Sequence, residues 1–132
     1  MAPDLQAEPL EGLGRVLLVE DDVLLRGLVG EAMRDAGLTV IEVANADEAR
    51  RYLQAGGRAQ LVFSDVEMPG SMDGIGLGRW IRQTYPDIAL ILTSGKAAPS
   101  AAALGHFIPK PYGLIEAAEI ARKMVDAKEG GG

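Results

Sequence analysis

Five short apolar runs, each followed by a segment of helical or weaker pattern, constrain the fold of this chain more than any other feature. Runs such as VLLV and IALIL are apolar at successive positions, which is typical of parallel strands covered by helices on both faces. Apolar residues recur with the helical period after the first, second, third and fifth runs. The runs are RVLLVE, LTVIEV, QLVFS, IALIL and HFIP, and the predicted helices span about 23–36, 46–55, 74–85 and 112–127.

This alternation predicts an α/β fold of the flavodoxin-like (βα)5 type. Such a chain forms a doubly wound parallel sheet, and of the two common strand orders we expect 2-1-3-4-5. At 132 residues the chain is long enough for one domain and too short for two of ordinary size. We therefore expect one domain over residues 15–127, with a flexible N-terminal tail at 1–14 and a flexible C-terminal tail at 128–132.

Capping residues mark the ends of the first two predicted helices. Asp22 is the predicted N-cap of the first helix, and Gly37 stands where its C-terminal cap belongs. Asn45 and Glu48 have the spacing of a capping box at the start of the second helix. The predicted inward stripe of the first helix consists of Leu24 or Leu25, Leu28, Ala32 and Met33.

Composition excludes several classes of function. The chain has 13 Lys and Arg against 19 Asp and Glu, and this net charge of −6 argues against a nucleic-acid surface, which needs clustered basic residues. The absence of cysteine excludes disulfides and thiolate metal sites. No basic and apolar leader opens the sequence, and no segment approaches the length of a membrane span. We therefore expect a cytoplasmic protein that binds neither nucleic acid nor membrane.

Polar side chains follow four of the five predicted strands. Glu20 and Asp21 end the first strand, Asp65 the third, Thr93 the fourth and Lys110 the fifth. Ligands of open α/β sheets bind at the carboxyl ends of the strands, and the predicted order places the first strand beside the third. Three carboxylates so close together repel one another, and a divalent cation relieves that repulsion. Oxygen ligands without thiolate or histidine favour Mg²⁺.

A Mg²⁺ site beside a lysine and a hydroxyl is typical of phosphoryl transfer, with Asp65 as the nucleophile. Taken singly, each residue also has a purely structural interpretation. Glu20 and Asp21 are compatible with a charged strand-to-helix turn, Asp65 with the start of a turn, and Thr93 with a strand-end cap. The combination of all of them favours a functional site.

Four motifs give the chain a specific resemblance to a known family. It resembles the response-regulator receiver domains of bacterial two-component signalling over about residues 15–127. No motif is specific alone, but together they follow the order and nearly the spacing of that family. The motifs are VLLVEDD, LVFSDVEMPGSMDG, ILTSG and FIPKPY.

The resemblance implies a role for each acidic residue of the site. Asp65 would be the phosphoacceptor, because it stands at the family's phosphorylated position. Asp21 would bind Mg²⁺ directly and Glu20 would bind it through water. The backbone carbonyl of Glu67 would be a further Mg²⁺ ligand.

The resemblance also implies a conformational switch. Thr93 would hydrogen-bond the phosphoryl group, and Lys110, joined to the next proline by a cis peptide bond, would pair with it. Phe107 would be the switch aromatic that moves together with Thr93, although taken alone it is compatible with the core of a strand. His106, next to it, is expected to be a surface residue and not a phosphodonor.

Two segments depart from the family's pattern. The loop MPGSMDG has one residue more than the commonest receiver loop, and we expect the chemistry to survive this change. The segment 93–110 is shorter than usual, so the fourth helix is expected to have one or two turns or to be irregular. This puts in doubt an interface built on the fourth helix, and leaves the first and last helices as the expected face for a kinase.

We therefore expect a stand-alone receiver that accepts a phosphoryl group on Asp65 from a phosphohistidine, with Mg²⁺ bound. The donor would be a histidine kinase or a histidine phosphotransfer protein. The phosphorylated domain would signal by changed docking to an unknown downstream protein, or act as a phosphate sink. It would assist its own phosphorylation and dephosphorylation without being an enzyme in the usual sense. The alternatives are a haloacid-dehalogenase-like Mg²⁺ phosphohydrolase and a receiver fragment of a hybrid histidine kinase.

Overall fold

The computed structural model describes residues 14–130, which alternate between strands and helices as the sequence predicts. The fourth predicted helix is short, with six residues, as expected from the short segment that contains it. The elements are β1 (Arg15–Val19), α2 (Val23–Asp35), β2 (Thr39–Val43), α3 (Ala46–Gln54), β3 (Leu61–Asp65), α4 (Gly74–Thr84), β4 (Ala89–Ser94), α5 (Pro99–Leu104), β5 (His106–Pro109) and α6 (Leu114–Gly130).

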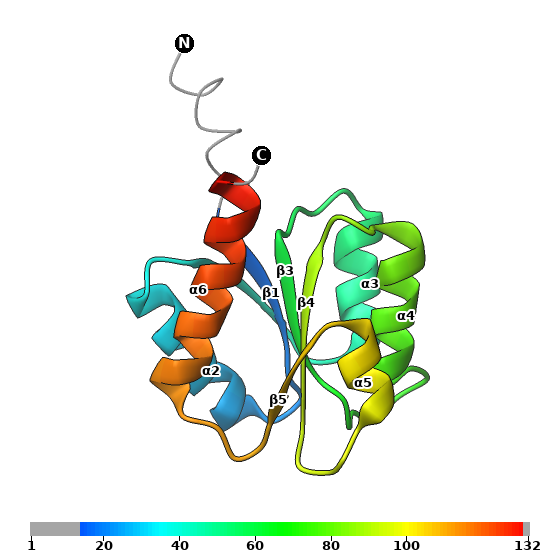
Figure 1. The fold of residues 1–132 in the computed structure, drawn as a ribbon. Helices are drawn as coiled ribbons and strands as arrows, with labels where there is room; N and C mark the ends of the chain where they lie inside the picture. The colour runs from blue at the N-terminus through cyan, green and yellow to red at the C-terminus, as the bar shows by residue number, and fades with distance from the viewer. Residues whose placement is uncertain (1–13, 131–132) are drawn as a thin grey trace.

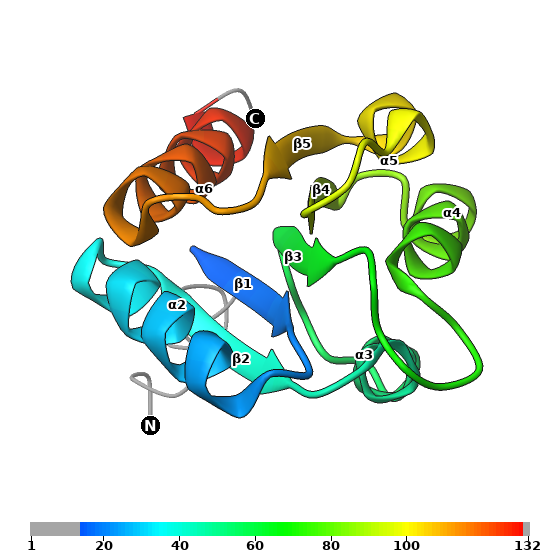
Figure 2. The same cartoon turned by 90° about the horizontal axis from the view of Figure 1, so that it is seen from below.

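The five strands form one parallel sheet in the order β2-β1-β3-β4-β5, which confirms the predicted topology. Helices α2 and α6 cover one face of the sheet, and α3, α4 and α5 cover the other (Figure 1, Figure 2). The loops that follow β1, β3, β4 and β5 meet at the lower edge in Figure 1, where the carboxyl ends of the strands lie. This edge is where a ligand of such a sheet binds.

Two apolar cores lie on the two faces of the sheet. Because successive strand residues point to opposite faces, Val16 and Leu18 of β1 belong to one core and Leu17 and Val19 to the other. Burial on both faces explains the continuous apolar runs in the sequence. The first core, under α2 and α6, includes Val29, Met33, Phe63, Ile91 and Ala121; the second, under α3, α4 and α5, includes Ala49, Leu53, Val62, Leu77 and Ile81.

Hydrogen bonds confirm the predicted caps. The Asp22 carboxylate accepts from the Leu25 N–H at 3.1 Å at the start of α2. Asn45 caps α3 by accepting from the N–H of Glu48 at 2.9 Å, and the Glu48 carboxylate reaches back to the N–H of Ala44. Gly37, with φ of +94°, ends α2 in a left-handed conformation that glycine adopts without strain.

The inward stripe predicted for the first helix is only partly correct. Leu25, Ala32 and Met33 contact the core, but Leu24 and Leu28 are 73% and 42% exposed. The reason is the rotation of α2, which turns its Leu25–Val29–Met33 row toward the sheet and leaves Leu24 and Leu28 facing outward. The last helix also differs from its predicted bounds, since it runs from 114 to 130 and not from 112 to 127. The predicted N-terminal tail lies outside the described residues, apart from Gly14.

Two glycines of α2 give a stability prediction with its own control. A Cβ added at Gly27 meets nothing within 4 Å, whereas one at Gly30 lies 2.5 Å from a carboxylate oxygen of Glu42. We expect Gly27→Ala to raise the free energy of unfolding by about 0.5–1 kcal/mol, because alanine is the better helix former. Gly30→Ala is expected to show no such gain, because it displaces Glu42 from its arginine partners. Urea unfolding of the two variants checks this, and an equal gain at both positions would contradict it.

Candidate functional site

The strand register brings the predicted acidic residues together. Val19 of β1 pairs with Ser64 of β3, so the residues that come next, Glu20 and Asp65, lie side by side at the edge of the sheet. Both are buried, at 4% and 5% exposure, while Asp21 is exposed. One carboxylate oxygen from each of the three lies within 4.8 Å of the others. This spacing suits a shared cation, which would be open to solvent on the side of Asp21.

Lys110 comes to the same place from the end of β5. Its Nζ lies 2.8 Å from Oδ2 of Asp65 and 3.8 Å from Oε1 of Glu20. The peptide bond to Pro111 is cis, as predicted, and the Lys110 N–H donates to the Ser94 carbonyl at 2.8 Å. Desolvation lowers the pKa of Lys110, but the hydrogen bond to Asp65 and the charges of Asp65, Glu20 and Glu67 together more than offset it, so this pKa lies above its ordinary value. The lysine is therefore held as a cation against the Asp65 carboxylate.

The loop after β3 holds the other oxygen of Asp65. The N–H of Glu67 donates to Asp65 Oδ1 at 3.2 Å, so the backbone of Glu67 lies against this carboxylate. The use of its carbonyl as a metal ligand stays a prediction. Further along the loop, α4 begins at Gly74, where a Cβ would collide with the carbonyl oxygen of Asp65. Glycine there lets the longer loop close tightly onto the site.

Thr93 lies in register with Asp65, on the neighbouring strand β4. Its side chain is fully buried, and its Oγ1 has no hydrogen-bond partner among the residues that the structure describes. A buried hydroxyl without a partner is unfavourable, since it has lost its hydrogen bonds to water. The site therefore contains a hydroxyl that is available to a group bound at Asp65.

Electrostatics at Glu20 favour the binding of a cation. Burial raises the pKa of the Glu20 carboxyl, and the negative charges of Asp65 and Asp21 raise it further, against opposing effects of the Asp22 N–H and Lys110. The ionised form of such a buried carboxylate is unfavourable unless a positive group lies nearby. Three oxygen donors, with no thiolate and no imidazole among them, match the ligands that Mg²⁺ prefers. The residues present therefore fit a magnesium ion.

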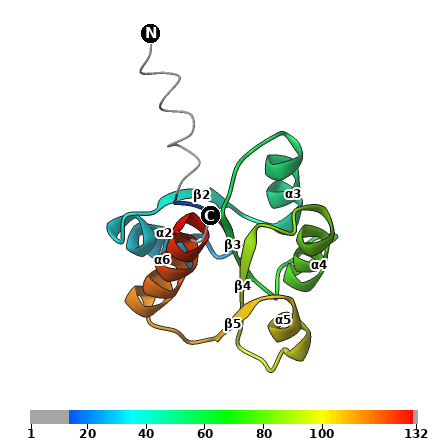
Figure 3. The same cartoon turned by 45° about the horizontal axis from the view of Figure 1, so that its top comes forward.

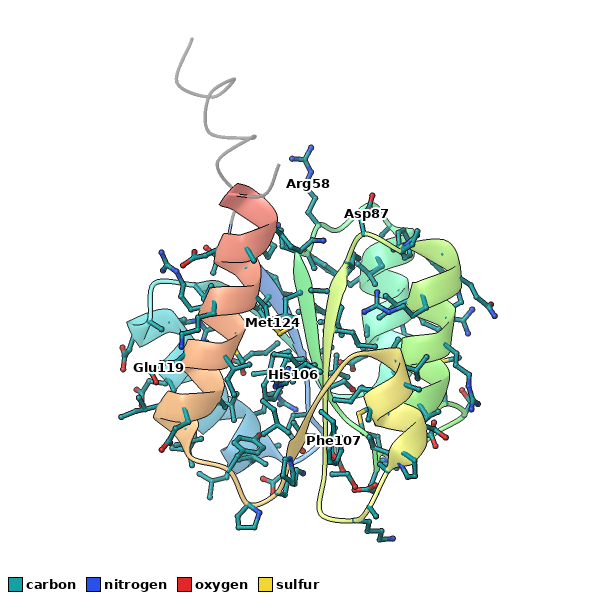
Figure 4. All side chains as sticks on the ribbon, viewed as in Figure 1. Arg58, Asp87, His106, Phe107, Glu119 and Met124 are labelled. Atoms are coloured by element: carbon teal, nitrogen blue, oxygen red, sulfur yellow. The ribbon has the colours of Figure 1, made fainter. Side chains whose placement is uncertain are left out.

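The two predicted residues of β5 differ in their surroundings (Figure 4). Phe107 is half-buried and contacts the core under α3, α4 and α5. His106 is exposed, as expected for a surface residue. Thus the candidate switch aromatic lies on the strand next to that of Thr93, paired in register with Leu92.

Sequence reasoning missed two side chains that support this site. Arg26 of α2 donates from Nη1 to the carbonyl oxygen of Glu20 at 2.8 Å. The buried hydroxyl of Ser94 donates to Oε2 of Glu67 at 2.7 Å and joins the loops after β3 and β4. No motif marks these positions, although the spacing of Arg26, a turn and a half after the acidic residues, was a signal that it could fold back over them.

Within residues 14–130, no helix is both long enough and apolar enough to cross a membrane.

Comparisons with solved structures identify the same fold. A CheY-like receiver domain from Methanospirillum hungatei superposes with a TM-score of 0.81 at 23% identity, over 91% of this chain and 99% of that one. The receiver domain of a histidine kinase from Syntrophus aciditrophicus gives 0.77 at 29% identity, over 86% and 91%. The response regulator TrrA from Thermotoga maritima, solved with Mg²⁺ and BeF, gives 0.76 at 27% identity, over 85% and 99%.

Sequence comparisons place the chain in a family. The sensor kinase CckA of Brucella abortus is 38% identical over 94% of this chain, which spans only 14% of that protein. The transcriptional regulator NtrC of Salmonella typhimurium is 33% identical over 85% of this chain, which spans 25% of that protein. A model of the response regulator receiver domain matches residues 16–119. The chain therefore belongs to the response regulator receiver domain family of two-component signalling.

Proposed function

We propose that Asp65 accepts a phosphoryl group from a phosphohistidine of a histidine kinase or a phosphotransfer protein. A carboxylate oxygen of Asp65 attacks the phosphorus, and a P–O bond forms. The P–N bond breaks, and its electron pair stays on the imidazole nitrogen of the donor. The product is an acyl phosphate on this chain. The observation that carries the proposal is the contact of Lys110 Nζ with Asp65 Oδ2, at 2.8 Å, at the edge where the acidic cluster meets.

Lys110 and Thr93 have complementary parts in this step. Lys110 already stands at the carboxylate, so its ammonium group neutralises negative charge on the incoming phosphoryl oxygens. The unpartnered hydroxyl of Thr93 can donate a hydrogen bond to one of these oxygens. This bond would satisfy a group that is otherwise buried without a partner, and it supplies the free energy for a local shift of β4.

Mg²⁺ would be held by the carboxylates of Glu20, Asp21 and Asp65 together with the backbone carbonyl of Glu67. When bound, the ion supplies positive charge that offsets the carboxylates and the phosphoryl oxygens. The structure of TrrA was solved in complex with Mg²⁺ and BeF, which supports assigning the same kind of ligand to this related site. As the family resemblance implies, Asp21 would bind the ion directly and Glu20 would bind it through water.

The signal would leave the site through β4 and β5. We propose that Thr93 moves toward the phosphoryl group and that Phe107, half-buried on the neighbouring strand, follows into the vacated space. The shift is a change of population between two surfaces, and a few kcal/mol of differential stability is enough to produce it. A downstream protein would then bind one surface better than the other, or the domain would act as a phosphate sink.

Helices α2 and α6 lie side by side (Figure 3), and we propose that the face they form is the docking surface for the histidine-bearing partner. Among the described residues, the exposed large hydrophobic side chains all belong to these two helices or their starts, and a groove of about 430 Å³ lies between them. Glu31, Asp35 and Glu119 line this groove, so we propose that the partner helix is apolar with basic flanks. The exposed side chains are Val23, Leu24, Leu28 and Ile115.

A charge placed in this groove is expected to separate docking from chemistry. Ile115 is 72% exposed in the first turn of α6, where an acidic residue does not harm the helix. With a kinase that phosphorylates the wild type, Ile115→Asp should slow phosphotransfer by about tenfold, as for the loss of an apolar interface contact. Labelling by acetyl phosphate should be unchanged. Ala103→Asp, on the exposed side of α5, is the control, and equal slowing by both variants would contradict the assignment.

The proposed function is tested by the intact mass of the protein after incubation with acetyl phosphate and Mg²⁺. We expect one phosphoryl group per chain. No adduct should form when EDTA is added before the donor. Continued release of phosphate from a phosphomonoester, without a stoichiometric adduct, would instead favour the phosphohydrolase alternative. That the receiver acts as a separate chain stays a prediction, because its relatives carry the matching segment within much longer proteins.

A further inference from the structure

The turn between β1 and α2 carries two of the proposed Mg²⁺ ligands and is held through its backbone. The N–H of Glu20 donates to the Val43 carbonyl of β2 at 3.1 Å. The carbonyl of Glu20 accepts from Nη1 of Arg26 at 2.8 Å. Both backbone groups of Glu20 are thus fixed from the α2 and β2 side. The direction of the Glu20 and Asp21 side chains depends on this backbone.

Arg26 is itself held in place by a carboxylate of β2. Its side chain is 20% exposed, and its Nε lies 3.7 Å from Oε1 of Glu42. The other oxygen of Glu42 lies 2.8 Å from Nη1 of Arg34, which stands about two helical turns after Arg26 in α2. Gly30, between the two arginines, leaves the space that the Glu42 carboxylate occupies. The guanidinium of Arg26 therefore spans from an anchored carboxylate to the turn.

These contacts distinguish Arg26 from an ordinary surface ion pair. The distance to Glu42 is too long for a hydrogen bond, whereas the distance to the Glu20 carbonyl is short. A cation so near a metal site would by itself oppose the binding of Mg²⁺. Glu42, which also pairs with Arg34, offsets part of that charge, so the guanidinium orients the turn with a weaker repulsion of the ion than a lone cation would exert.

We infer that Arg26 is a positioning residue for the Mg²⁺ site, acting through the carbonyl of Glu20 and steadied by Glu42. This inference rests on the proposed function, because it assumes that Glu20 and Asp21 hold the ion. Residues that orient metal ligands without touching the metal typically change its affinity by about 10–100-fold. Arg34 provides a matched comparison, since it contacts Glu42 and the Val40 carbonyl but not the turn.

The test is a calorimetric titration of the full chain with Mg²⁺, together with urea unfolding without the ion. Arg26→Ala is expected to raise the Kd for Mg²⁺ by about tenfold. Arg26→Lys, which keeps a donor near the carbonyl, should recover most of this loss, and Arg34→Ala, which leaves the bond from Arg26 to the Glu20 carbonyl in place, should raise the Kd much less than Arg26→Ala does. If Arg26→Ala folds poorly, Arg26→Gln removes the charge with a smaller loss of volume and is expected to show weakened binding too.

The outcomes separate this inference from the proposed function. Unchanged Mg²⁺ affinity in Arg26→Ala or in folded Arg26→Gln would overturn it, as would an equal loss in Arg34→Ala. A wild-type chain that binds no Mg²⁺ would instead contradict the proposed function, and the inference with it. A merely structural role for Arg26 predicts lower stability in urea with no change in the Kd.

Discussion

Asp65→Asn is expected to abolish phosphorylation by acetyl phosphate, with no adduct in the intact mass. The amide keeps the shape of the side chain and can still accept a hydrogen bond from Lys110, which lies 2.8 Å from the carboxylate. However, it is neutral and lacks the nucleophilic oxygen that forms the acyl phosphate. The effect is therefore expected on the chemistry and not on the fold.

The control is Asp87→Asn, because Asp87 is exposed and lies at the opposite end of the sheet (Figure 4). This variant should be labelled as fully as the wild type. An adduct of wild-type size in Asp65→Asn would refute the assignment of the phosphoacceptor. It would direct attention to the other carboxylates of the cluster.

The neighbouring residues Asp21 and Asp22 are expected to respond in opposite ways to the same substitution. Asp21→Ala removes a carboxylate of the acidic cluster and should abolish phosphorylation at any ordinary Mg²⁺ concentration. Asp22→Ala removes the N-cap that binds the Leu25 N–H, and should cost about 1 kcal/mol of stability while leaving phosphorylation intact.

Both variants would be compared by intact mass after acetyl phosphate and by urea unfolding. Because the two side chains are chemically identical and both exposed, the comparison separates the metal site from the helix cap. Loss of phosphorylation in both variants would show that the whole turn, and not Asp21 alone, is required.

Much of the site could be predicted because its residues stand at the ends of strands. The apolar runs locate the ends of β1, β3, β4 and β5, and parallel pairing then brings those ends to one edge. The contact of Lys110 with Asp65, across 45 residues of sequence, follows from this topology. The burial of Thr93 follows as well, since β4 is covered on both faces.

Other contacts could not be predicted, because they depend on how elements rotate and how loops meet. Ser94 bonds Glu67 only because the loops after β3 and β4 close on each other. Leu28 was expected to face inward, yet it is exposed. The helical period shows which residues share a row, but it does not specify how far the helix is rotated about its axis and therefore which of two adjacent apolar rows faces the sheet.

The sequence by itself determined the order of elements, the parallel sheet, the helix caps and the identity of the residues at the edge that carries the proposed site. These follow from local periodicity and from the chemistry of short motifs, which neighbouring residues carry. Only the tertiary structure decided that Arg26 binds the Glu20 carbonyl, and that apolar side chains of α2 and α6 stay exposed beside an acidic groove. Such contacts are set by the packing of whole elements against the sheet, which distributes apolar surface between core and solvent.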